Sequence, residues 1–159
     1  MRKKIVTAVL LISSVFLVSC GVSGNAEPQR NTDIGLPAHE YNIYLSTEVN
    51  TVLNQLTTRM ANARFIADGI DAAENEIAST DYSIGVVEKC LDTVKDINIT
   101  GSYVVDRDEA IRLFEQVLIE LNVYKANIST GNTEEIRNCI SRMEMLCSSL
   151  TSLGNQIYK

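Results

Sequence analysis

Four cysteines and one histidine are the side chains of this 159-residue chain best suited to covalent, redox or metal chemistry. They are Cys20, Cys90, Cys139, Cys147 and His39. No two cysteines have the CxxC spacing of redox or zinc motifs. A single imidazole beside Glu40 has no second imidazole with which to hold a metal or build a triad. We therefore expect no metal site and no thiol redox site, and we expect His39 to be exposed near the start of a helix.

Other catalytic patterns are also missing from the sequence. It contains no glycine-rich phosphate loop, no GxSxG elbow and no twelve-residue calcium loop. Di-iron bundles use Glu-x-x-His motifs, and none occurs here. We interpret acidic pairs such as Glu74/Glu76 as solvated helix faces, and Glu134/Glu135 as charges that a helix N-terminus favours. The sequence thus predicts no catalytic residue, no cofactor and no enzymatic activity.

Cys20 differs from the other cysteines in the residues that precede it. Three basic residues, Arg2 to Lys4, are followed by an uncharged apolar run from Ile5 to Val18, which is the layout of a secretory signal peptide. A bilayer-spanning helix needs about 20 apolar residues, more than this run provides. The last four residues, Leu17-Val18-Ser19-Cys20, resemble the lipobox of bacterial lipoproteins. An ordinary signal peptide with a chance cysteine is the alternative.

The resemblance implies that Cys20 carries a thioether-linked diacylglyceryl group and becomes the mature N-terminus. Two acyl chains anchor a protein stably where one is marginal. The implied location is the extracytoplasmic face of the cell membrane. Gly21 follows, so the aspartate that retains some lipoproteins at an inner membrane is absent. The sequence is therefore compatible with two locations, the surface of a Gram-positive cell and an outer membrane.

Removal of residues 1–19 makes the chain more acidic. The mature chain keeps 11 Lys and Arg against 20 Asp and Glu, a formal charge of −9. Nucleic acid and anionic lipid are then poor partners for the folded part, because both require clustered basic residues. Residues 20–38 contain three glycines and both prolines, which is typical of a flexible tether. We predict a signal peptide at 1–19, a lipidated cysteine and tether at 20–38, and one domain at 39–159.

The predicted domain consists of helices, because apolar residues recur there every three or four positions. The first stripe predicts a long helix from Tyr41 to Ile77, with Gly69 as a weak point. The second follows Ser79-Thr80-Asp81, which we expect to cap a helix. The third follows a capping-box spacing of Asp106 and Glu109. The fourth begins at Asn132, after Gly131 has ended the third helix.

Four one-sided helices with short connections favour an all-α, up-down-up-down antiparallel four-helix bundle. A three-helix arrangement with the first helix standing apart is the alternative. Phe114 and Tyr124 fall on the third stripe, and we expect them in the core. Tyr41, Tyr44 and Tyr158 lie at the ends of the domain, and we expect them to pack together there.

The three later cysteines cannot all pair within one chain. Cys139 and Cys147 are eight residues apart on one helix, about 12 Å along its axis, whereas a disulfide permits Cα separations of about 4.4–6.8 Å. We therefore favour buried free thiols. An intrachain bridge would have to use Cys90, and Cys90 with Cys147 is the pair that we would choose.

Two functions fit these patterns. The favoured one is a membrane-anchored, non-enzymatic helical interaction module that binds a protein partner in the cell envelope. The alternative is a lipid-tethered binding protein that holds a small apolar ligand in a groove of the bundle. We favour the first because the stripes carry enough Leu, Ile and Val to fill a core.

Overall fold

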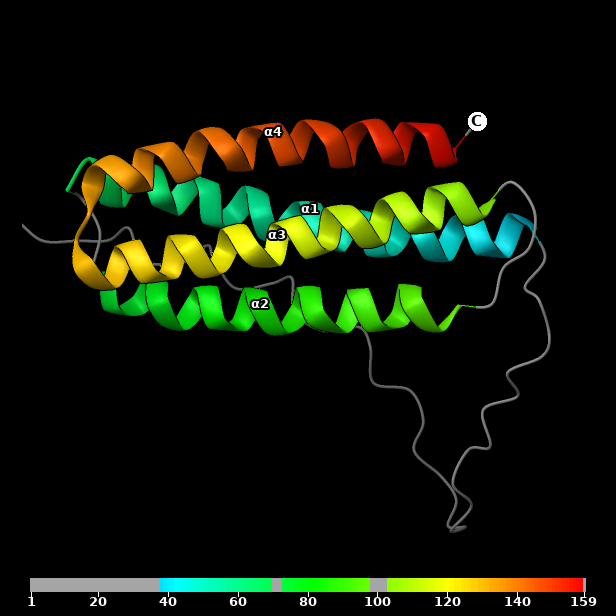
Figure 1. The fold of residues 1–159 in the computed structure, drawn as a ribbon, viewed down its shortest axis with the longest axis horizontal. Helices are drawn as coiled ribbons and strands as arrows, with labels where there is room; N and C mark the ends of the chain where they lie inside the picture. The colour runs from blue at the N-terminus through cyan, green and yellow to red at the C-terminus, as the bar shows by residue number, and fades with distance from the viewer. Residues whose placement is uncertain (1–37, 70–72, 98–102, 159) are drawn as a thin grey trace, which may run out of the picture. The chain divides into compact units, whose positions relative to one another are not determined.

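The described part of the protein is a bundle of four α-helices. A computed structural model describes residues 38–69, 73–97 and 103–158. Within these ranges the chain forms α1 (Ala38–Ala67), α2 (Ala73–Asp96), α3 (Tyr103–Thr130) and α4 (Thr133–Ile157), and no strand. The predicted all-α four-helix bundle is confirmed, and α1 is the longest of the four helices (Figure 1).

The helices form a ring in which sequence neighbours pack side by side. α1 packs against α2 and α4, and α3 also packs against α2 and α4. α1 and α3 approach each other at few places across the core, while no Cα atom of α2 lies within 8 Å of one in α4. Arg64 pairs with Glu144 near one end of the α1–α4 seam, and Gly154 faces Val49 nearer the other, so these two helices are antiparallel. The alternative with a separate first helix is therefore wrong.

One end of the bundle collects the first turn of α1, the last turn of α2, the first turn of α3 and the last turn of α4 (Figure 1). The ring contact between Tyr41 and Tyr103 joins α1 to α3 there, with centroids 5.4 Å apart. Gln156 of α4 donates to Asp106 of α3 in the same region. We call this end the base. It is the end at which the chain from residue 37 enters α1.

The predicted apolar stripes face the core. In α1, the buried residues recur at steps of four and three, as in Tyr41, Leu45, Val49, Val52 and Leu56. The buried residues of α3 and α4 likewise lie on one face of each helix. Phe114 and Tyr124 are fully buried, as expected. The largest fully buried side chains are Tyr41, Tyr124, Phe114, Leu45, Leu56, Leu113, Leu121, Ile136, Met143 and Leu150.

The boundary between the first two helices was predicted wrongly. α1 ends at Ala67 rather than Ile77, because Gly69 adopts a left-handed φ of 75° and its N–H bonds to Ile66 O, which closes the last turn. The stripe continued past this break because α1 and α2 bury residues in the same core. The expected cap residues 79–81 lie inside α2, where the Thr80 hydroxyl donates back to Glu76 O.

The start of α3 also differs from the prediction. The helix begins at Tyr103, so Asp106 lies in its first turn rather than at its cap. Burial of Tyr41 against the Tyr103 ring, together with a hydrogen bond from the Tyr41 hydroxyl to Tyr103 O, holds this extra turn in place. Tyr44 and Tyr158, which we had expected to pack with Tyr41, are exposed instead.

The start of α4 is confirmed. Gly131 adopts a left-handed φ of 67° after α3. The Asn132 side chain then accepts a hydrogen bond from Glu135 N at 3.2 Å and caps α4. This motif is local, so its residues could be recognised from the sequence alone.

Candidate functional site

Cys20, the predicted attachment residue, lies outside the described residues, as do the rest of the signal region and residues 21–37. Ala38 is the first described residue and opens α1 at the base. His39 lies in the first turn of α1, but the predicted exposure of its side chain lies outside what the structure describes. The base is therefore the part of the described fold nearest along the chain to the predicted lipid.

The three later cysteines are free thiols. Cys90 and Cys139 are buried, and Cys147 is half-buried. The bridge between Cys90 and Cys147 that we named is not formed. Cys90 lies on α2 and Cys147 on α4, whose Cα atoms are all more than 8 Å apart, beyond the reach of a disulfide. The Cys147 sulfur instead lies 3.8 Å from the Thr57 hydroxyl of α1.

Burial suppresses ionisation of all three thiols. It raises the pKa of Cys90 to about 12, with the neighbouring Glu48 carboxylate as the second cause. It likewise raises the pKa of Cys139 to about 12, and Glu120 adds to the effect. Burial also raises the pKa of Cys147, but Thr57 opposes this by hydrogen bonding. Because the thiolate is the reactive form, none of these residues has the lowered pKa of a catalytic cysteine.

Iodoacetamide at neutral pH should modify Cys147 before Cys90 and Cys139 in the native protein. Cys147 is the most accessible of the three, and its hydrogen bond with Thr57 favours the thiolate. Mass spectrometry of digested samples would follow each site with time, and in urea all three should react. A Cys147→Ser variant should lose the fast phase. Equally fast modification of native Cys139 would contradict the buried environment described here.

A buried charged cluster lies between α1, α2 and α3. Glu76 is 2% exposed and Arg59 8%. The Glu76 Oε2 atom accepts from Arg59 Nη1 at 2.9 Å and from Asn62 Nδ2 at 2.8 Å, while Oε1 accepts from the Tyr124 hydroxyl at 3.2 Å. Burial, followed by the Glu76 charge, raises the pKa of Tyr124. The carboxylate thus ties three helices together.

The interpretation of Glu76 as part of a solvated face was wrong. The buried residues of α2 include Glu76, Thr80, Ser83, Val87 and Cys90, which follow one another at steps of four and three. Extending the apolar stripe of α2 backwards would therefore have placed Glu76 in the core. The first three residues of this buried line, Glu76, Thr80 and Ser83, are polar, so a search for apolar residues does not find them. The partners of Glu76 and Ser83 lie on α1 and α3, and the sequence does not specify these pairs.

A second polar cluster joins α3 to α4. Arg142 donates from Nε to Glu120 Oε2 at 2.8 Å, and from Nη2 to Glu135 Oε1 at 2.8 Å and to the Cys139 sulfur at 3.2 Å. The hydrogen bonds that Arg142 donates to Glu120 and then to Glu135 raise the pKa of Arg142. The guanidinium is already engaged on three sides. This cluster stabilises the helix pair, and the second carboxylate oxygen of Glu120, Oε1, is buried without a hydrogen-bond partner among the described residues.

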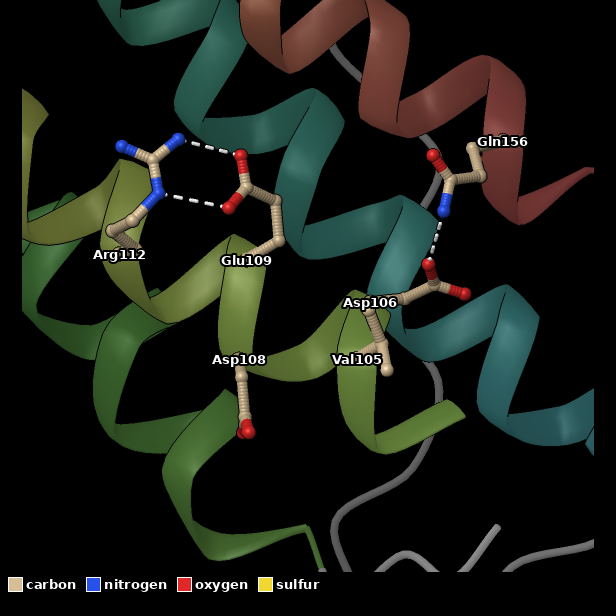
Figure 2. Close-up of a pocket in the computed structure, with 6 residues that line it drawn as sticks. All are labelled: Val105, Asp106, Asp108, Glu109, Arg112 and Gln156. Carbon is tan, nitrogen blue, oxygen red and sulfur yellow. Dashed lines mark hydrogen bonds and ion pairs between the residues drawn. The ribbon is translucent and has the colours of Figure 1, made fainter. Parts of the chain in front are cut away.

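A pocket opens at the base between α3 and α4, and Figure 2 shows the residues that line it. Its lining consists of Val105, Asp106, Asp108, Glu109, Arg112 and Gln156. Most of the polar groups already have partners: Gln156 binds Asp106 at 2.7 Å, and Arg112 Nε binds Glu109 at 2.8 Å. Val105 is the one apolar side chain in the lining. The pocket therefore lacks the apolar walls that a small apolar ligand requires.

Within the described ranges, no three His, Cys, Asp or Glu side chains are grouped so that they could hold a metal ion. None of the described helices is long and apolar enough to cross a membrane. No protein-family model, curated protein or solved structure matches the chain. The proposals below therefore rest on its own residues.

Proposed function

We propose that this protein is a bacterial lipoprotein, anchored through a diacylglyceryl group on Cys20 at the extracytoplasmic face of the cell membrane. The four-helix domain is a non-enzymatic interaction module that binds a protein partner in the cell envelope. The observation that carries the proposal is the ordered sequence signal: a basic start, an apolar run that is too short to span a bilayer, and Leu17-Val18-Ser19-Cys20.

The described domain supports the interaction module over the apolar-ligand alternative. Large apolar side chains from all four helices fill the core, including Leu45, Val87, Phe114 and Leu150. The pocket at the base is lined mostly by charged residues. An excess of acidic residues in the mature chain favours a basic partner surface, because complementary charge accelerates encounter and selects partners.

Metabolic labelling with a fatty acid tests the anchor. In a bacterial host with lipoprotein-processing enzymes, the wild-type chain should incorporate the label and sediment with membranes. Cys20→Ser should abolish both, since serine has no sulfur to form the thioether. The readouts are label in the isolated protein and its distribution between membrane and medium.

The other cysteines provide matched controls. Cys90→Ser, Cys139→Ser and Cys147→Ser should each keep the label and the membrane association, because these residues belong to the helical domain. Wild-type protein that stays unlabelled and appears whole in the medium would refute the proposed anchor. Loss of label in one of the later variants, with Cys20 intact, would move the attachment to that residue.

A further inference from the structure

Large apolar side chains that remain exposed in the described domain gather toward the base. Eight such residues are more than half exposed, and four of them lie in the helix segments next to that end. These four are Ile43, Tyr44, Val105 and Tyr158. The other four, Phe65, Tyr82, Ile119 and Met145, are spread along the four helices away from the base.

The four residues belong to α1, to α3 and to the position after α4, and each lies within about 10 Å of its helix end at the base. Val105 is the third residue of α3, and Tyr158 directly follows α4. Tyr44 is six residues into α1, about 9 Å from its start. A membrane interface admits apolar side chains to a depth of about 5–10 Å. The base could therefore place all four in one interfacial layer without moving a helix.

The chain enters the domain at the same end. Ala38 lies eighteen residues after Cys20 and opens α1 at the base. A fully extended segment of this length spans at most about 65 Å, and the 30 residues of α1 extend about 45 Å beyond its start. The base is the end that an anchored chain brings to the bilayer by the shortest route.

The charges of the base favour a neutral lipid surface. Arg107 pairs with Asp108, and Arg112 pairs with Glu109, so basic groups in the first turns of α3 are neutralised within the helix. Asp106 adds a further negative charge beside Val105 (Figure 2). Anionic headgroups attract clusters of free Lys and Arg, and the described residues of the base offer no such cluster. Tyrosine, in contrast, is enriched at membrane–water interfaces because its ring is amphipathic.

We infer that the base of the bundle docks on the surface of a zwitterionic bilayer, with Ile43, Tyr44, Val105 and Tyr158 inserted at the interface. This inference rests on the proposed lipid anchor. Docking orients the helices away from the membrane and leaves their acidic sides and the far end, where α3 turns into α4, available to the partner.

Tryptophan reporters test the docking in the full lipidated chain. The protein has no tryptophan, so Tyr158→Trp introduces a single reporter. Tyr82→Trp is the matched control, because Tyr82 and Tyr158 are both 70% exposed but Tyr82 lies on α2 away from the base. Each variant is reconstituted in phosphatidylcholine vesicles with or without brominated acyl chains, and flotation measures membrane association separately.

Both reporters should float with the vesicles, but only Trp emission from Tyr158→Trp should shift to the blue and be quenched by brominated lipid. Tyr44→Trp should behave in the same way, which guards against disruption of the α4 end. Flotation with neither base reporter quenched overturns the docking and leaves the anchor intact. Equal quenching of Tyr82→Trp also overturns it, because the bundle would then lie on its side. Failure to float overturns the anchor and the docking together.

Discussion

Glu76→Ala should lower the free energy of unfolding by about 3–5 kcal/mol. The substitution leaves the Arg59 guanidinium 8% exposed without the carboxylate that pairs with it. The Arg59 Nε atom already has no hydrogen bond within the described part of the chain, so no second acceptor is in place. Asn62 and the Tyr124 hydroxyl lose their acceptor as well. Small domains are stable by about 5–15 kcal/mol, so the variant should lose a large and readily measured share of its stability.

Urea denaturation of a fragment from Ala38 to Lys159, followed by far-ultraviolet circular dichroism, measures this change. Glu74→Ala is the matched control, since Glu74 lies in the same first turn of α2 but is exposed. It should change stability by no more than about 0.5 kcal/mol. A Glu76→Gln variant keeps an acceptor but removes the charge, and it should fall between the two. Equal stabilities of the Glu76→Ala and Glu74→Ala variants would show that the buried cluster is not formed in solution.

Phe114→Ala should destabilise the domain by about 3–5 kcal/mol. Phe114 is fully buried on α3 within the apolar core, and loss of the ring removes its transfer free energy and leaves a cavity. Phe65→Ala removes the same ring from a side chain that is 51% exposed. Surface substitutions of this kind usually change stability by less than about 0.5 kcal/mol, so the two variants should separate clearly.

The same experiment bears on function. A tightly filled core has no room for a ligand, whereas an apolar groove would let neighbouring side chains collapse into the space that Phe114 leaves. The cost of Phe114→Ala would then fall well below the expected range. Matching unfolding curves for Phe114→Ala and Phe65→Ala would therefore count against the described core and revive the ligand-binding alternative.

Local patterns determined that the domain is helical and which apolar residues face its core. The recurrence of apolar residues every three or four positions identified Leu45, Phe114 and Leu150 as core residues, because periodicity records which face of a helix meets its neighbours. The start of α4 could also be predicted, since Asn132 and Glu135 form their contact within one turn. The proposed anchor at Cys20 is likewise a local signal, but it lies outside the described residues and stays a prediction.

Only the tertiary structure decided the features that depend on residues far apart in the chain. Contact with Tyr41 set the start of α3 at Tyr103, and Arg59 and Tyr124 turned Glu76 from an apparent surface charge into the centre of a buried cluster. The break after Ala67 was hidden because α1 and α2 bury their residues in one core, so the apolar stripe runs past Gly69 without interruption. Sequence periodicity specifies the face that a helix buries, but not the partner that it meets, and a buried charge is stable only where that partner supplies the opposite charge.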